Sequence, residues 1–232
     1  DTGNRGNGYL EKKIALTIAL EIGKQLSTQK GIKVIFTRKD DRFIELKNRA
    51  KIANQADADL FVSIHCDAFT SPKAYGAGTF VLGLHRNKDN FRIAQNENSV
   101  IFLEEDHETT YEGFDPNNPE SVISLVLMQE TYNSQSIEAA NTIQKSFVTN
   151  LNRKDRTVKQ AGFLVLYKTT MPSVLIETAF LPNPTEERLI GSAEGQQKMA
   201  QAMFQAFVNF KNATEGKSAA TGTIEQKPVE TK

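Results

Sequence analysis

Two apolar segments far apart in the chain each end at one side chain that could take part in catalysis. Leu60–Ile64 leads to His65, and Val174–Ile176 leads to Glu177. A carboxylate on a buried strand is costly to desolvate unless it is paired or bound to a metal ion. Because sites form at the carboxyl ends of strands in open parallel sheets, we expect His65 and Glu177 to share a site.

Glu11 is the third candidate, because it follows a glycine-rich loop (Gly3, Gly6 and Gly8) at the beginning of a predicted helix. Histidine and carboxylate ligands with one open position are how proteins hold catalytic zinc. Such an ion polarises a carbonyl group and acidifies water. A further carboxylate such as Glu177 could then take the proton from that water. These residue types therefore suit metal-assisted hydrolysis of an amide.

Glu11 and His65 each also have a simpler explanation, whereas Glu177 is the hardest of the three candidates to explain in another way. Glu11 could be a surface charge that favours a helix N-terminus, and His65 could be a hydrogen-bonded core histidine. The glycines could cradle a phosphate, although their spacing is not G-x-G-x-x-G.

Cys66 is the single cysteine and could bind metal or act as a nucleophile, but the alternation along a strand predicts that it faces away from His65. His85 and His107 lie in polar sequence and are expected to be solvated.

The composition of the chain excludes several functional classes. The 232 residues are enough for one large domain or two small ones. The 28 Lys and Arg residues balance the 28 Asp and Glu residues, so no basic footprint for nucleic acid is present. No apolar stretch of about 18 residues exists, so no transmembrane helix is expected. No signal peptide opens the sequence, as is also expected of a processed or trimmed chain.

Hydrophobic periodicity indicates which elements position the candidates. It predicts helices over residues 9–29, 46–54 and 194–210, and strands over residues 33–37, 59–65, 78–84, 162–167 and 174–177. This alternation is typical of an α/β fold, a mostly parallel twisted sheet with helices on both faces. Since the sequence opens with a loop and a helix, a further strand is expected upstream of Asp1.

An insert interrupts this pattern over about residues 87–135. It is polar and acidic, with Glu104–Asp106 and Asp115–Pro119, and from Ser121 it leads into a long amphipathic helix that runs toward Leu151. A connection of this length within a domain is usually functional or disordered. From residue 212 the chain has almost no large apolar side chains, so we expect one catalytic domain over 1–211 and a tail or linker over 212–232.

The chain resembles the zinc-dependent N-acetylmuramoyl-L-alanine amidases of the type 3 cell-wall class. The resemblance covers about residues 1–210, with the motifs in the same order. The matching stretches are Asp1–Gly3, Asn7–Lys12, Val34–Arg38, Asn48–Ala50, Ala53–Asn54, Ala58–His65, Val158–Phe163, Pro172–Glu177, Asn183–Pro184 and Glu186–Glu187.

The resemblance implies a zinc site and a reaction. Glu11 and His65 match two zinc ligands, and the third, a histidine in a Gly-His-Gly-Gly segment, is expected just upstream of Asp1. Glu177 matches the catalytic glutamate, which acts as the general base. The bond cleaved would join the lactoyl group of N-acetylmuramic acid to L-alanine in peptidoglycan.

The insert is similar to a segment of the amidases that separate daughter cells of Gram-negative bacteria. That segment can block the zinc site until an activator with a degenerate metallopeptidase-like domain relieves the block. The resemblance therefore implies a periplasmic, autoinhibited enzyme. Our hypothesis is that an insert carboxylate, among Glu104, Glu105 and Asp106, reaches the metal; the alternative is a solvated acidic loop.

Two other functions remain open. Because the third ligand lies outside the sequence, the chain could be a catalytically silent, wall-binding or regulatory relative. The glycine-rich start also leaves an α/β enzyme with a phosphate ligand as a further alternative.

Overall fold

A computed structural model describes residues 2–6, 8–68, 71–84, 87–127 and 131–221, so His85 lies outside the described residues. The strands are β1 (Phe61–Asp67), β2 (Ala77–Leu82), β3 (Asp155–Ala161) and β4 (Ser173–Phe180). The helices are α1 (Glu11–Leu26), α2 (Leu46–Gln55), α3 (Lys88–Asn98), the 3-10 helix η1 (Ser99–Leu103), α4 (His107–Thr110), α5 (Pro119–Leu127), α6 (Asn133–Leu151), α7 (Pro184–Gly191) and α8 (Ala193–Thr221).

The four strands form one sheet in the order β1-β4-β2-β3. β1 is parallel to β4 and β2 is parallel to β3, whereas β2 and β4 are antiparallel. The prediction of a mostly parallel α/β sheet is therefore confirmed. The register pairs His65 directly with Glu177, so the two strand-end candidates lie on adjacent strands and on one face of the sheet.

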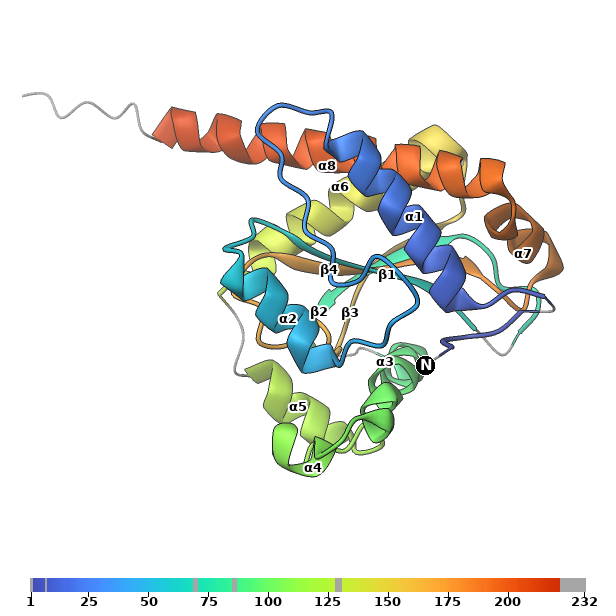
Figure 1. The fold of residues 1–232 in the computed structure, drawn as a ribbon, viewed down its shortest axis with the longest axis vertical. Coiled ribbons are helices and arrows are strands. Elements are labelled where there is room, and N and C mark those ends of the chain that lie inside the picture. Colours follow the sequence, from blue (N-terminus) through green and yellow to red (C-terminus); the bar gives the residue numbers. More distant parts are fainter. Residues whose placement is uncertain (1, 7, 69–70, 85–86, 128–130, 222–232) are drawn as a thin grey trace, which may run out of the picture.

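Helices cover both faces of this sheet, as predicted (Figure 1). On one face, α1, α6 and α8 contribute buried residues such as Ile18 and Ile143 to a cluster with β4. On the other face, α2, α3 and η1 contribute Leu46 and Ile101 to a second cluster with β2 and β4. Each cluster removes a continuous apolar surface from water, which is the main favourable term in folding.

The strand predicted over residues 162–167 is wrong. β3 ends at Ala161, and the apolar residues that follow, from Phe163 to Leu166, are buried in a series of turns. A short apolar run reports burial but does not by itself distinguish a strand from another buried conformation. Gly162 is needed at the junction, because a Cβ atom there would collide with the side chain of Val122.

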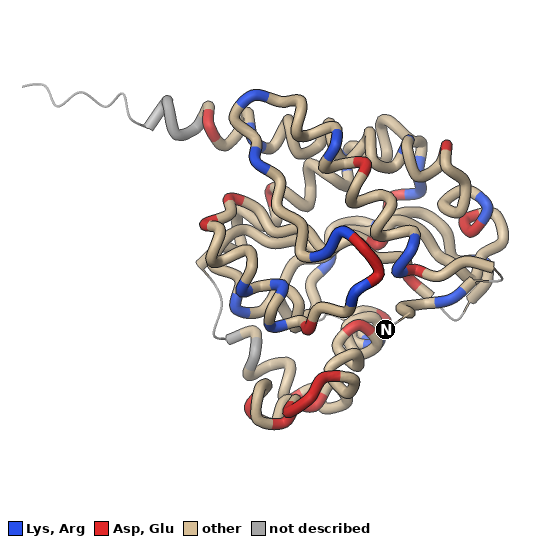
Figure 2. The backbone as a smooth tube through the Cα atoms, viewed as in Figure 1, with Lys and Arg blue, Asp and Glu red and all other residues tan. Residues whose placement is uncertain are grey.

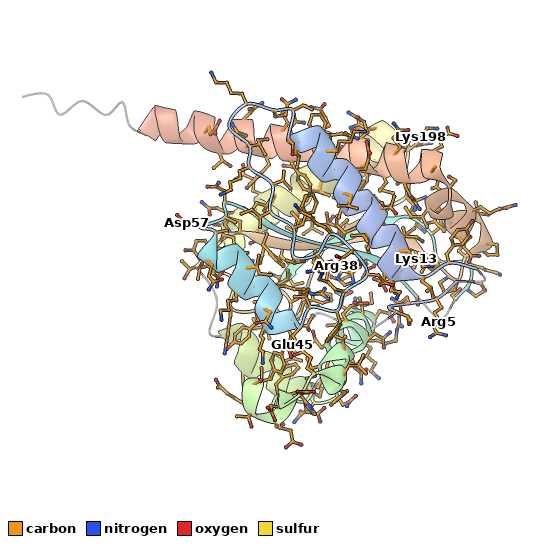
Figure 3. All side chains as sticks on the ribbon, in the orientation of Figure 1. Arg5, Lys13, Arg38, Glu45, Asp57 and Lys198 are labelled. Atoms are coloured by element: carbon orange, nitrogen blue, oxygen red, sulfur yellow. The ribbon has the colours of Figure 1, made fainter. Side chains whose placement is uncertain are left out.

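The strand predicted over residues 33–37 is also wrong, because the structure gives this segment no strand pairing. Its side chains alternate in exposure, as in a strand. Alternation shows only which side of a segment faces the core, and a strand also needs a neighbouring strand to pair with. The segment instead packs on α1, where Phe36 fills the space over Gly23. Arg38, labelled in Figure 3, donates to the carbonyl of Lys12 at 2.7 Å and holds the segment at the first turn of α1.

The long helix predicted from Ser121 is divided into α5 and α6, and residues 128–130 between them lie outside the described part of the chain. The division follows from packing on opposite faces of the sheet, since Val122 of α5 contacts Gly162 and Ile143 of α6 lies in the cluster with α1 and α8.

The last helix, α8, buries Met199 and Phe207 as its periodicity predicts, and it continues to Thr221, into the segment expected to be a tail. Among the described residues, no helix is both long enough and apolar enough to cross a membrane.

Candidate metal and catalytic site

The structure brings Glu11 and His65 together. Glu11 is buried in the first turn of α1, and its Oε1 lies 2.9 Å from Nδ1 of His65 at the end of β1. The same carboxylate accepts hydrogen bonds from the backbone N–H groups of Asn4 at 2.6 Å and Cys66 at 3.1 Å. Glu11 is therefore held by two main-chain donors from different segments, and the interpretation of it as a surface charge is wrong.

The glycine-rich loop makes this placement possible. Gly3 has a φ of +64°, and a Cβ atom at this position would lie 2.5 Å from Oε2 of Glu11. At Gly6 a Cβ atom would collide with the carboxylate of Glu187 in α7, which also accepts a hydrogen bond from the N–H of Gly8 at 3.2 Å. The glycines thus allow the backbone to approach two carboxylates closely.

Glu97 completes the cluster, and sequence reasoning did not single it out as a site residue. It lies in the last turn of α3, within the insert, and its Oε2 is 2.8 Å from His65 Nδ1. Glu11, His65 and Glu97 offer ligand atoms that all lie within 4.8 Å of one another. Ile93 is buried four residues earlier in α3, so helical periodicity could have placed Glu97 on the inward face.

Glu177 lies beside His65 in the register and is only 1% exposed. Neither of its carboxylate oxygens has a hydrogen-bond partner among the described residues. Burial raises the pKa of Glu177 well above its ordinary value, and the nearby charges of Asp67 and Glu97 raise it further. A buried carboxylate without partners is costly, so this side chain is available for a ligand or for a proton.

The ionisation of His65 depends on the surrounding carboxylates. Burial alone would lower the pKa of its imidazole, but Glu97 and Glu11 outweigh burial and raise that pKa well above the usual value. Opposite charges also act on Glu11, whose pKa is lowered by His65 and by backbone donors even though burial opposes this. Two acidic groups therefore converge on one ring nitrogen.

Cys66 takes no part in this cluster. As predicted, it points away from His65 and packs in the core cluster on the opposite face of the sheet. Its Sγ lies 3.2 Å from Oγ1 of Thr178, and burial raises the pKa of the thiol well above its usual value. A neutral buried thiol is a poor nucleophile and a poor metal ligand.

The donor set fits a divalent cation. Two carboxylates near one imidazole nitrogen leave excess negative charge in a buried position, which a bound cation would offset. Nitrogen from histidine and oxygen from carboxylates are donor types that zinc accepts. Glu11 and His65, the two ligands implied by the sequence, are thus placed where they could hold one metal ion.

The three acidic residues expected to reach the metal lie elsewhere. Glu104 is buried, and it accepts hydrogen bonds from the N–H of Leu46 at 2.8 Å and from the hydroxyl of Tyr111 at 2.6 Å. Its carboxylate therefore satisfies the first N–H group of α2, which is a capping role. Glu105 and Asp106 are exposed. Figure 2 shows acidic residues gathered around α4, at the far end of the insert.

Comparisons with known proteins identify the family of the chain. The family model described as N-acetylmuramoyl-L-alanine amidase matches residues 1–209. The amidase AmiA of Escherichia coli K12 is 34% identical over 213 residues, which cover 90% of this chain and 72% of AmiA. The amidase AmiC of Neisseria meningitidis is 32% identical and covers 89% of this chain and 49% of AmiC.

A solved structure of similar fold is the N-acetylmuramoyl-L-alanine amidase of Clostridium difficile 630. It has a TM-score of 0.68 and 27% sequence identity, and the match covers 92% of this chain and 91% of that one. The family match spans the sheet, the insert and the Glu11–His65–Glu177 site. The chain therefore belongs to the N-acetylmuramoyl-L-alanine amidase family.

Proposed function

We propose that the protein is a zinc-dependent peptidoglycan amidase, which hydrolyses the bond between the lactoyl group of N-acetylmuramic acid and L-alanine. The observation that carries this proposal is the juxtaposition of Glu11 and His65, 2.9 Å apart, with the unpartnered carboxylate of Glu177 on the adjacent strand. The family relationship supplies the substrate. A histidine upstream of Asp1 is the expected third ligand.

The metal ligands and Glu177 have separate roles in the proposed reaction. Zinc held by Glu11 and His65 would supply a Lewis acid that polarises the scissile carbonyl and acidifies water. Glu177 then accepts the proton of the attacking water and returns it to the departing nitrogen of L-alanine, which leaves as an amine. Both carboxylate oxygens of Glu177 are buried and have no hydrogen-bond partner among the described residues, so they are available to accept this proton and return it.

The direct test is Glu177→Gln in the full-length protein, measured by dye release from labelled peptidoglycan and by metal content. We expect hydrolysis to fall by about 10²–10⁴-fold while zinc is retained, since the general base is lost and both ligands remain. Glu194→Gln is the matched control, because Glu194 lies on the surface of α8, where it forms an ion pair with Lys198. Unchanged hydrolysis in Glu177→Gln would contradict the proposed role.

The same assay separates the alternatives. A catalytically silent relative would bind peptidoglycan without releasing dye in any variant. An enzyme with a phosphate ligand would neither bind the wall nor retain zinc.

We also propose that the insert inhibits the enzyme. Glu97 contacts the ring nitrogen of His65 at 2.8 Å, and so occupies space that water and substrate need. Its neighbour Asn98 is buried and attaches α3 to the loop after β3 through two hydrogen bonds. Asn98 donates to the carbonyl of Gly162 at 2.7 Å and accepts from the N–H of Leu164 at 2.8 Å.

Further contacts support this closed arrangement. Ile101 in η1 is completely buried, and Glu104 binds the N-terminus of α2. The segment from α3 to Glu104 is thus attached to the catalytic domain beyond the contact with His65. Opening it would need a partner, and by the family resemblance we propose a periplasmic activator used in daughter-cell separation.

A further inference from the structure

The second ring nitrogen of His65 has a partner that neither the reaction nor the metal site explains. Ser63 precedes His65 by two residues in β1, so both side chains lie on the same face of the sheet. Oγ of Ser63 lies 2.9 Å from Nε2 of His65. The opposite nitrogen, Nδ1, faces the carboxylates of Glu11 and Glu97.

This geometry bears on which nitrogen can bind a metal. A neutral imidazole carries one proton, and the partner of one nitrogen determines whether the other has a free lone pair. If Nδ1 of His65 binds zinc, the proton must lie on Nε2, where the oxygen of Ser63 can accept it. We propose that Ser63 is a positioning residue that holds His65 in the Nε2–H tautomer and orients the ring so that Nδ1 is the metal ligand.

The ring of His65 is held on both sides, by carboxylates at Nδ1 and by Ser63 at Nε2. Thr178 donates from its hydroxyl to the carbonyl of His65 at 2.9 Å, which holds the main chain and leaves the Nε2 side of the ring to Ser63. Ser63 is 7% exposed, so little water is available to replace its hydroxyl. Partners of this kind fix the tautomer and orientation of histidine ligands, and their loss weakens metal binding by about 10–100-fold.

The inference rests on the proposed zinc site, and it is tested by zinc affinity in the full-length protein. Zinc dissociation constants from competition with a chromophoric chelator would be compared for wild type, Ser63→Ala and Ser63→Thr. We expect Ser63→Ala to bind zinc about 10–100-fold more weakly, and Ser63→Thr, which keeps the hydroxyl, to recover most of the affinity.

Ser146→Ala is the matched control. Ser146 is 6% exposed; its hydroxyl donates to the carbonyl of Ala202 at 2.7 Å and accepts from the amide of Asn150 at 2.8 Å, so its loss removes two hydrogen bonds away from the site. We expect Ser146→Ala to lower thermal stability at least as much as Ser63→Ala does while leaving zinc affinity unchanged. An equal loss of zinc affinity in both variants would show a general effect of destabilisation and would overturn the inference.

A spectroscopic measurement keeps the inference testable if a variant folds poorly. Nitrogen-15 NMR of the zinc-loaded wild type reports which nitrogen of His65 carries the proton, and we expect Nε2. A proton on Nδ1, or wild-type zinc affinity in Ser63→Ala, would overturn the role of Ser63 and leave the proposed amidase intact. If the wild-type protein binds no zinc, the proposed function itself fails.

Discussion

The first turn of α1 and the last turn of α3 each bring one carboxylate to the same nitrogen of His65, but they hold it differently. Glu11 is fixed by the backbone N–H groups of Asn4 and Cys66. Among the described residues, the polar partners of the Glu97 carboxylate are side chains, namely His65 at 2.8 Å and the amide of Asn4 at 3.4 Å. The carboxylate of α1 is thus part of the catalytic domain, whereas that of α3 depends on the position of the insert.

The two carboxylates are of one donor type, yet only Glu11 is held by main-chain groups outside the insert. Backbone donors hold Glu11 wherever α3 lies, because both belong to segments outside the insert. Glu97 can leave without breaking a main-chain hydrogen bond of the catalytic domain at the site. We therefore expect opposite effects on hydrolysis when the two carboxylates are removed.

Glu11→Ala has the largest expected effect. Loss of a metal ligand weakens zinc binding more than loss of a residue that supports a ligand. Zinc affinity should therefore fall by more than about 100-fold, and hydrolysis should fall with it. Metal content after dialysis and dye release from labelled peptidoglycan measure both. Glu21→Ala is the control, because Glu21 lies on the same helix and accepts a hydrogen bond from Gln25. Normal zinc binding in Glu11→Ala would contradict the role of Glu11 as a metal ligand, and with it the proposed difference between Glu11 and Glu97.

Glu97→Ala should act in the opposite direction. If Glu97 blocks the site, its removal should raise basal hydrolysis about tenfold, equivalent to about 1.4 kcal/mol in favour of the open form. The exposed Glu105 of the same insert provides the control variant, Glu105→Ala, which should leave the rate unchanged. A fall in hydrolysis in Glu97→Ala would mean that Glu97 is a lasting ligand like Glu11.

Asn98→Ala tests whether the attachment of α3, rather than the carboxylate itself, sets the inhibition. It removes two hydrogen bonds to the main chain, and a loss of about 1 kcal/mol should raise basal hydrolysis about fivefold. Hydrogen exchange over residues 88–103 should increase at the same time.

Asn54→Ala is the matched control for Asn98→Ala. The amide of Asn54 also bridges two main-chain groups, the carbonyl of Lys168 and the N–H of Thr170, but it lies outside the insert. Equal activation in both variants would attribute the effect to general loosening of the domain.

The smallest expected effect is on the pH dependence of stability in metal-free protein. The raised pKa of Glu177 means that the folded state binds its proton more tightly, so stability falls as pH rises above the unfolded value near 4.5. His65 acts in the same direction above about 6.5. Glu11, whose pKa is lowered, instead loses its contribution as pH falls below about 4.5.

Thermal unfolding of chelator-treated protein between pH 5 and pH 8 measures this effect. We expect the melting temperature to fall with rising pH, by about 2–4 °C for each kcal/mol lost. Glu177→Gln should remove the slope below about pH 6.5 and leave the contribution of His65 above it. A wild-type profile that is flat below pH 6.5 would contradict the raised pKa of Glu177.

Local sequence patterns were enough to predict which candidate residues lie near strand ends and helix starts. His65 and Glu177 follow apolar runs, and Cys66 faces away from His65, because alternation along a strand is a local property of the backbone. The motifs around Glu11 and Glu177 also identified the family, since they lie in a recognisable order along the chain.

Local patterns did not predict which carboxylate of the insert lies next to His65. Glu97 rather than Glu104 contacts His65, because Asn98 binds the loop after β3 and Glu104 binds the first N–H of α2. The conformation of the apolar run after Gly162 was also not predicted from the sequence, because this run is buried in turns rather than paired as a strand. Both features depend on contacts between segments that are distant in sequence, and local periodicity carries no information about such contacts.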